Sequence, residues 1–245
     1  EPAFNLPAVW IPEDKKEESK LAGYTVVDNV TVMATHLTEI IRKHSSEMLG
    51  RQEVQGLLDN LSKAFPKAVE ELVPNLLSLG NVQKVLQSLL QEQISIKDML
   101  TIVETLADYA PYTKDPELLT EYVRHKLSRS IVSPYIGEDG VLKLITMAQD
   151  VEDVLLKGIQ KTEHGSYLSI DPKVADPIIT SIKKESEKAM AINVQPILMT
   201  SPTIRRHLKK MVEYFVPSLM VLSQSELLSD MRFKSIGEVS LNYAD

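Results

Sequence analysis

Residues 23–62 read GYTVVDNVTVMATHLTEIIRKHSSEMLGRQEVQGLLDNLS, and this stretch decides the fold. β-rich residues at 24–27 predict a short strand, and Asp28 offers a side-chain oxygen to the free N–H groups of a helix start. Over residues 29–48, apolar side chains recur at three- and four-residue steps, which predicts a long amphipathic helix. Gly50 ends that helix and a second helix opens directly after it. The stretch therefore joins a small domain before it to further domains after it.

The composition excludes several classes of protein. The chain has 245 residues and a net charge of −7, which disfavours a general nucleic-acid or anionic-membrane binder. The absence of cysteine rules out a disulfide framework and a thiolate metal site. No apolar run approaches the ~20 residues of a membrane-spanning helix, and no signal peptide is visible. The sequence begins in mid-pattern at Glu1, so we expect a fragment of a longer protein.

The chain is expected to be multidomain, with separate α and α/β parts. Three prolines and an alternating apolar segment in residues 1–12 predict an edge strand or an irregular entry, because proline cannot donate to a sheet ladder. Together with the strand at 24–27, this segment indicates the end of a small α/β subdomain. After the linking helix, prolines and glycines separate apolar patterns of helical period, which predicts an all-helical subdomain. The four predicted units are 1–28, 29–48, 49–128 and 129–245.

The period of the apolar pattern changes near residue 129, where strands begin to alternate with helices. The expected elements are, in order, a hairpin over 131–146, helices over 148–161 and 172–191, a strand at 195–199, a helix over 203–215, and strands at 219–222 and 233–241. Such alternation predicts a C-terminal α/β subdomain with a mixed sheet.

No constellation of residues argues for catalysis. The five histidines are scattered. His36 and His44 could share a helix face, but no Asp or Glu stands at a ligand spacing beside them, so ordinary packing or surface roles are expected rather than a metal site. The five are His36, His44, His125, His164 and His207. The sequence contains no glycine-rich phosphate loop, no G-x-S-x-G motif and no cysteine nucleophile. We therefore expect neither an enzyme nor a bound cofactor.

Residues 82–110 superficially suggest a helix-turn-helix. A recognition helix should present basic or amide side chains to bases and phosphates. This segment instead carries Asp98, Glu104 and Asp108 against the single Lys97. Reading of DNA is therefore disfavoured.

A basic run lies on the predicted helix after Pro202. It consists of Arg205, Arg206, His207, Lys209 and Lys210. A run of this kind is usually a solvated face, although it could also meet an acidic partner. With residues 82–110 it leaves open a helical nucleic-acid-binding regulator as an alternative. Salt-dependent binding to duplex DNA would support that alternative.

The exact residues of several segments, and not only their apolar periodicity, are informative. They include EPAFNLPAVWI at residue 1, GYTVVDNVTVMATHL at 23, LGRQEVQGLLDNL at 49, VPNLLSLGNVQKVLQSLLQEQISIKDMLTIVETLADYAP at 73 and QPILMTSPTIRRHLKKMVEYFVPSLMVLSQSEL at 195. In this order the segments resemble the FlhA, or FHIPEP, family of flagellar type III export-gate proteins. Virulence-associated injectisome relatives share the architecture and are the alternative, but GRQE and ATHL favour the flagellar branch.

The resemblance implies the soluble C-terminal part of a membrane protein, on the cytoplasmic face of the bacterial inner membrane. It implies a non-catalytic docking platform that orders export by binding flagellar chaperones with their cargo and components of the ATPase complex. It also implies self-association into a ring, expected to be a nonamer. Residues 29–48 would then be one helix of a thioredoxin-like first subdomain, and no nucleic-acid partner is expected.

The resemblance also implies a docking site. In the family, a shallow apolar dimple between the first two cytoplasmic subdomains receives the chaperones. The matching positions are Glu1, Phe4 and Thr35, with Val27 and Val32 as lining residues. By themselves the apolar members would be core residues, and Thr35 would be an indifferent helix residue. At residue 1 this chain has Glu where the family more often has Asp.

Overall fold

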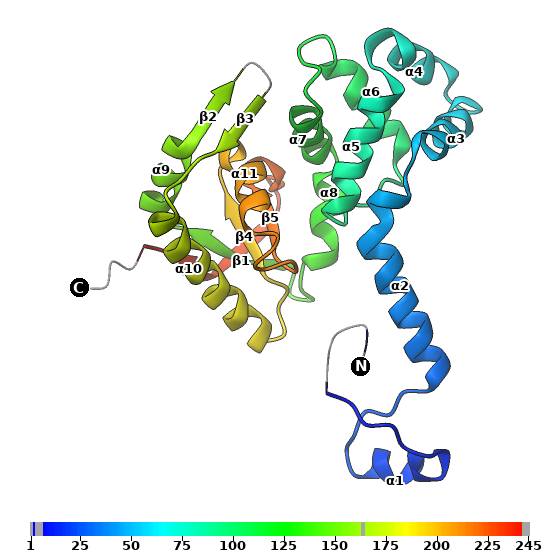
Figure 1. The fold of residues 1–245 in the computed structure, drawn as a ribbon, viewed down its shortest axis with the longest axis vertical. Helices are drawn as coiled ribbons and strands as arrows, with labels where there is room; N and C mark the ends of the chain where they lie inside the picture. The colour runs from blue at the N-terminus through cyan, green and yellow to red at the C-terminus, as the bar shows by residue number, and fades with distance from the viewer. Residues whose placement is uncertain (1, 3–6, 163–164, 242–245) are drawn as a thin grey trace.

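The computed structural model describes residues 2, 7–162 and 165–241. A long helix, α2, rises from an N-terminal segment to a helical body, and an α/β body lies beside that helical body (Figure 1). The multidomain architecture with α and α/β parts is confirmed.

The N-terminal segment contains η1 (Glu13–Lys15) and α1 (Lys16–Leu21) and leads into α2 (Asn29–Met48). The strand predicted at 24–27 is wrong, because this stretch lacks regular structure. Of the two alternatives for the first segment, residues 7–12 take the irregular one. A strand needs a neighbour to accept and donate its ladder bonds, and in the described residues neither stretch pairs with one.

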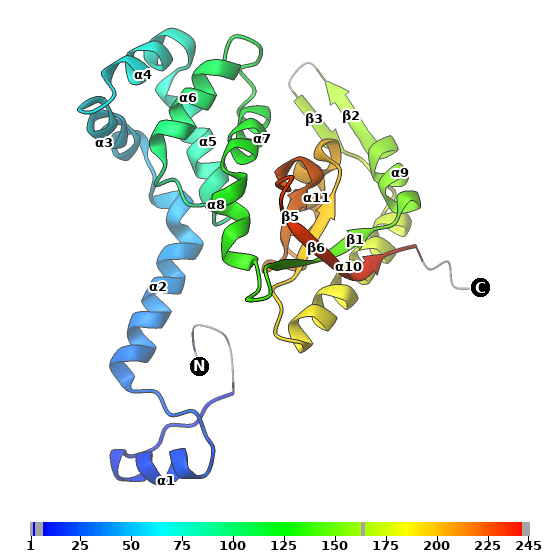
Figure 2. The ribbon, with the colours of Figure 1, turned by 180° about the vertical axis from the view of Figure 1, so that it is seen from behind.

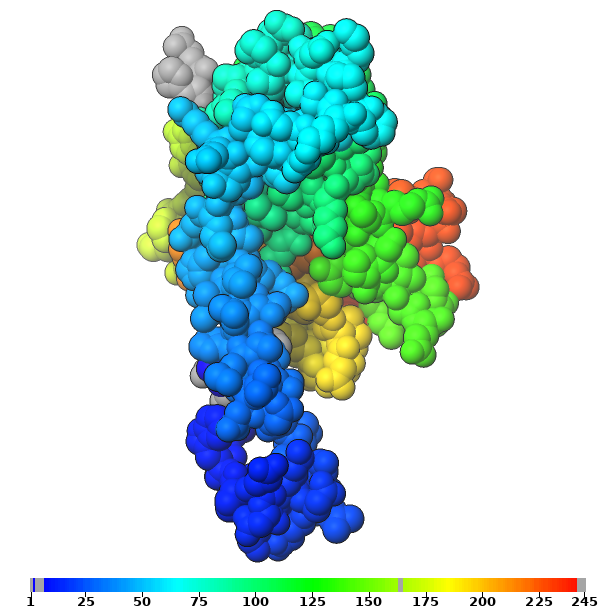
Figure 3. Space-filling view, turned by 90° about the vertical axis from the view of Figure 1, so that its right-hand side faces the viewer, coloured from blue at the N-terminus to red at the C-terminus, as the bar shows by residue number. Residues whose placement is uncertain are grey.

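Helix α2 is confirmed, and its start is capped as predicted. The Asp28 carboxylate accepts from the Thr31 backbone N–H at 2.9 Å and from the Thr31 hydroxyl at 2.8 Å. Figure 3 shows α2 as a column that connects the N-terminal segment to the rest of the molecule. Its apolar side is largely exposed. The exposed residues are Val30, Met33, Leu37, Ile40, Ile41 and Met48.

Seven further helical elements build the helical body. They are α3 (Arg51–Ser62), α4 (Pro66–Glu70), η2 (Glu71–Leu76), α5 (Leu79–Gln91), α6 (Met99–Tyr109), α7 (Pro116–Lys126) and α8 (Ser128–Val132). Their shared apolar core includes Val85, Leu86, Ile102, Leu106 and Val123, all fully buried. Where α2 meets this body, the side chains of Gln83 and Gln87 on α5 both donate to the Leu49 carbonyl at 3.0 Å. These bonds hold the end of α2 against α5.

The α/β body contains a four-stranded sheet and a separate hairpin. Its elements are η3 (Ser133–Tyr135), β1 (Val141–Met147), α9 (Gln149–Gly158), β2 (Ile159–Thr162), β3 (Gly165–Leu168), α10 (Pro172–Ala191), β4 (Ile197–Thr200), α11 (Pro202–Val212), β5 (Met220–Ser223), η4 (Gln224–Glu226) and β6 (Arg232–Val239). The sheet has the order β5-β4-β1-β6 and is parallel throughout, while β2 and β3 pair antiparallel. The sequence predicts one mixed sheet, whereas the four-stranded sheet is parallel and the antiparallel pairing lies in the separate β2–β3 hairpin. The α/β character is as predicted, since helices connect the successive parallel strands β1, β4 and β5.

Two local predictions in this region are wrong. Residues 131–136 do not form one arm of a hairpin, because Ile131 and Val132 lie on α8, where both side chains are buried in the helical core. A single bridge between Ile136 and Leu142 is what remains of that pairing. The predicted helix to 161 ends at Gly158, where the chain enters the β2–β3 hairpin. Burial in the helical core decides the first outcome over the local pattern. Pairing of β2 with β3 decides the second.

The parallel sheet has an apolar core on each face. Figure 2 shows the helical body beside the α/β body that contains this sheet. Side chains alternate along each strand, so neighbouring residues enter different cores. Ile197 of β4 packs with the helical body, whereas Leu198 packs with α9, α10 and α11. β5 follows the same rule, with Leu222 toward the helical body and Val221 on the opposite face. The helical body thus covers one face of the sheet directly.

This shared core supports a matched prediction. We expect Ile197→Val to lower the free energy of unfolding by about 1 kcal/mol, because it removes one methylene from a packed site. Ile192→Val, at a side chain that is 58 % exposed, is the control, with an expected change within about 0.5 kcal/mol. Urea unfolding followed by circular dichroism measures both. Equal effects at the two positions would contradict the shared core.

Candidate protein-docking site

Three of the residues implied by the family resemblance lie at the start of α2. Val27 and Val32 stand just before the cap and at the fourth helical position, the spacing of a hydrophobic staple. Thr35 follows Val32 by three residues, so their side chains are neighbours on one helix face. Both are half-buried, whereas Val27 is 48 % exposed. The fold therefore places the Thr35 hydroxyl one turn from Val32 near an accessible helix start, with Val27 just before the cap.

Glu1 and Phe4, the other two implied residues, lie outside the described residues. The joining of all five side chains into one dimple therefore stays a prediction. The described residues provide a helix start capped by Asp28, and this cap helps to hold Val32 and Thr35 in a fixed orientation.

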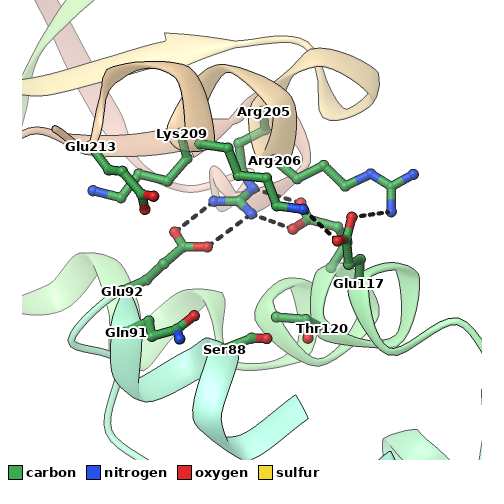
Figure 4. A pocket seen from close by; sticks show the side chains of 11 residues that line it. Ser88, Gln91, Glu92, Glu117, Thr120, Arg205, Arg206, Lys209 and Glu213 are labelled. Carbon is green, nitrogen blue, oxygen red and sulfur yellow. Dashed lines mark hydrogen bonds and ion pairs between the residues drawn. The ribbon is translucent and has the colours of Figure 1, made fainter. Parts of the chain in front are cut away.

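A second cluster, which the sequence did not reveal, lies where α11 meets the helical body (Figure 4). Arg205 of α11 is 1 % exposed and bridges two helices. Its guanidinium donates to both carboxylate oxygens of Glu92 at 2.7 and 3.1 Å. It also donates to Glu121 of α7, with one bond of 2.6 Å and a second to the other oxygen. These paired contacts are the bidentate geometry that guanidinium and carboxylate groups favour.

Arg124 of α7 extends the cluster toward β5. Its Nη1 donates to Glu92 at 3.0 Å, and its Nη2 lies 2.6 Å from Glu226 and donates to the Val221 carbonyl at 3.3 Å. Glu226 in turn accepts from the backbone N–H of Ser223 at 2.7 Å. The cluster is thus a continuous chain of charged groups from α5 through α7 to η4 and α11.

The electrostatics of the cluster depend on both burial and partners. Burial alone would raise the pKa of Glu92, but the Arg124 and Arg205 guanidiniums outweigh it and lower that pKa to about 2. Burial would lower the pKa of Arg205, but Glu92 and Glu121 raise it. Burial lowers the pKa of Lys209, whose ammonium donates to the Leu219 carbonyl at 2.9 Å. At neutral pH Glu92 and Arg205 are therefore both charged.

An outer rim of more accessible ion pairs surrounds this buried cluster. Arg206 lies 3.4 Å from Glu117 and 3.6 Å from Asp115, both on the N-terminal part of the α7 region. Arg206 also donates to the Ser166 hydroxyl on β3 at 2.6 Å, and Lys210 pairs with Glu117. The rim therefore ties α11 both to the helical body and to the β2–β3 hairpin.

The interpretation of residues 205–210 as a solvated face is wrong. Arg205 and His207 are buried, and the acidic partner considered as the alternative is the helical body of the same chain. One signal was present in the sequence, since Glu117, Glu121 and Arg124 share a helix face at steps of four and three residues. The finding also weakens the nucleic-acid alternative, because a guanidinium committed to Glu92 and Glu121 is not available to phosphates.

Within residues 2, 7–162 and 165–241, no group of three or more His, Asp or Glu side chains converges as metal ligands would. In the same part of the chain, no helix has the length and apolar character needed to cross a bilayer.

Comparison with known proteins connects these features to a family. The model of the FHIPEP family matches residues 1–232, which is nearly the whole chain. This chain belongs to the FHIPEP family. The resemblance drawn from its motifs is thereby confirmed.

The FHIPEP chain is 45 % identical to the flagellar biosynthesis protein FlhA of Bacillus subtilis over 241 residues, which are 98 % of this chain and 36 % of FlhA. It therefore spans about a third of that relative's length. The Chlamydia pneumoniae CdsV protein, solved in complex with CdsO, superposes with a TM-score of 0.85 at 30 % identity, covering 97 % of this chain and 71 % of that one. The nonameric SctV-C of EPEC superposes with a TM-score of 0.81 at 31 % identity, covering 93 % and 68 %.

Proposed function

We propose that this FHIPEP chain is part of a flagellar type III export gate and serves as a docking platform without a catalytic step of its own. The observation that carries the proposal is the 45 % identity to a flagellar protein over nearly the whole chain. The solved injectisome relatives named above are less similar, at 30 and 31 %, which favours the flagellar branch over an injectisome gate. The chain would act at the cytoplasmic face of the inner membrane, within a longer membrane protein.

The proposed partners follow from the same relatives. A ring of identical subunits is proposed because the EPEC relative is nonameric. A component of the ATPase complex is proposed as a second partner, with the CdsO complex of the Chlamydia relative as precedent for a bound export protein. Flagellar chaperones carrying their cargo are the third. We also propose the division into units 1–28, 29–48, 49–128 and 129–245, in which α8 crosses the last boundary and packs into the helical core.

The proposed chaperone site consists of Glu1, Phe4, Val27, Val32 and Thr35. An apolar depression with a threonine and a carboxylate at its rim can receive an apolar helix anchor and orient it by hydrogen bonds. The exposure of Val27 and the half-buried positions of Val32 and Thr35 support this use, because all three remain accessible to a partner. Affinity in the micromolar range is expected, since a gate must release each complex.

Calorimetric titration of a flagellar chaperone–cargo complex into the soluble part of the natural full-length protein tests the proposal. We expect binding to weaken at least about tenfold in Phe4→Ala, which removes an apolar anchor contact, and in Thr35→Met, which loses the hydroxyl and fills the depression. Thr180→Met, the same change at an exposed position of α10, is the matched control and should bind like the wild type.

Each outcome of this titration bears on a different part of the proposal. Loss of binding in both variants, with the control intact, supports the α2 site. If the wild type binds and the two variants bind equally well, these site residues are wrong while the docking function stands. If the wild type does not bind any chaperone–cargo complex, the docking function itself is wrong.

A further inference from the structure

A cavity of about 360 Å³ lies in the α/β body between the β2–β3 hairpin, the start of α10 and α11. Its size is in the range of sites that take a small ligand or a few side chains of a partner. The lining residues are Ser166, Tyr167, Leu168, Ile170, Ala175, His207, Lys210 and Met211. None of them belongs to the site proposed on α2, and Figure 1 shows the hairpin and α11 far from the lower end of that helix.

The lining of this hairpin pocket is mainly apolar, with a few polar side chains. Leu168, Ile170 and Met211 are half-buried, so each keeps some surface for an occupant. Among the polar lining residues, His207 is 4 % exposed and its Nε2 lies 3.2 Å from the Ser166 hydroxyl. Burial lowers the pKa of His207, as do the facing Arg206 and Lys210, against the opposing effect of Glu117. The imidazole is therefore neutral at pH 7.

Lys210 supplies the charge of the pocket, since the remaining described lining residues are neutral. Its side chain is 57 % exposed, and its ion pair is with Glu117, which is 40 % exposed. A pair this accessible contributes little to stability and can exchange partners easily. Glu117 also has a second cation within reach, because Arg206 lies 3.4 Å away. A carboxylate that takes Lys210 from Glu117 would therefore leave no orphaned charge behind.

We propose that the hairpin pocket docks a protein segment in which an apolar side chain stands beside an acidic residue. The apolar side chain would pack against Leu168, Ile170 and Met211, and the carboxylate would exchange with Glu117 for Lys210. Charge complementarity favours this occupant, because Lys210 is the charged side chain among the described lining residues and an acidic segment gains an ion pair with it. The proposal concerns a second partner surface and does not depend on the α2 site.

A pair of peptides tests the chemistry of the pocket. One is an acetylated and amidated peptide with a glutamate beside a phenylalanine, and the other is its glutamine twin. Methyl NMR of the 245-residue chain reports on Met211, Ala175 and Ile170. We expect the glutamate peptide to shift these resonances and to bind about fivefold more tightly than its twin, as one accessible ion pair allows.

Three variants separate the roles of the charges. Lys210→Gln should weaken the glutamate peptide about fivefold, and Glu117→Gln should tighten it two- to fivefold by freeing Lys210, all on the scale of about 1 kcal/mol per accessible pair. Neither change should affect the glutamine twin. Lys188→Gln is the control, because Lys188 has the same 57 % side-chain exposure and also pairs with a glutamate, but lies on α10 outside the pocket.

Two results would overturn the proposal. One is the absence of shifts in the pocket methyl groups with millimolar glutamate peptide, in both the wild type and Glu117→Gln. The other is equal binding of the two peptides, which would rule out an acidic occupant. Amide spectra of each variant confirm that the fold is intact, and chaperone binding through α2 is read out separately by calorimetry.

Discussion

Replacing Arg205 with methionine is expected to lower the free energy of unfolding by about 3–5 kcal/mol. Methionine fills similar volume but provides no donors, so the Glu121 carboxylate loses its bidentate partner and Glu92 keeps only Arg124. Both carboxylates are largely screened from water, with side-chain exposures of 17 and 19 %. An uncompensated charge in such a place is far more costly than the loss of a surface pair.

Urea unfolding at pH 7 measures this effect, with Lys67→Met as the control. Lys67 also pairs with a glutamate, Glu70, but its side chain is 92 % exposed, so the expected change is within about 1 kcal/mol. A double-mutant cycle sharpens the result, because Arg205→Met should cost less when Glu121→Gln is already present. A cost for Arg205→Met no larger than that of the control would contradict the role assigned to the buried cluster.

The second large effect is a loss of stability in acid that originates at Glu92. The folded protein lowers the pKa of this carboxyl from 4.5 to about 2, so its stabilisation is fully present above about pH 5. As pH falls toward 2, the unfolded state takes up the proton first, and the stabilisation is progressively lost. A shift of this size corresponds to about 3 kcal/mol.

Unfolding measured at several values between pH 7 and pH 3 tests this origin. Glu92→Gln cannot titrate, so the stability of the variant should fall less steeply with decreasing pH than that of the wild type. The two proteins should differ most at neutral pH and converge in acid. Parallel pH dependences for the two proteins would assign the acid sensitivity to other carboxyl groups.

The sequence by itself determined the family, the presence of separate α and α/β parts, and most of the helices. Local chemistry explains this success, because caps such as Asp28 and Asp115 and apolar periodicity act within one or two turns. For the candidate site, the motif placed Thr35 on the helix, and the staple spacing of Val27 and Val32 is also local. The roles of Glu1 and Phe4 in the site stay predictions, since both lie outside the described residues.

Only the tertiary structure decided the roles of residues that depend on distant partners. Arg205 belongs to a run that is basic along the chain, yet Glu92, which buries and neutralises it, lies 113 positions away. Ile131 and Val132 have a β-like pattern, but the helical core buries them in α8. Residues 24–27 are β-rich, but a strand requires a neighbouring strand. In the described chain no strand pairs with these residues. Local propensity is weak beside burial and charge pairing, and those two depend on which segments the fold brings together.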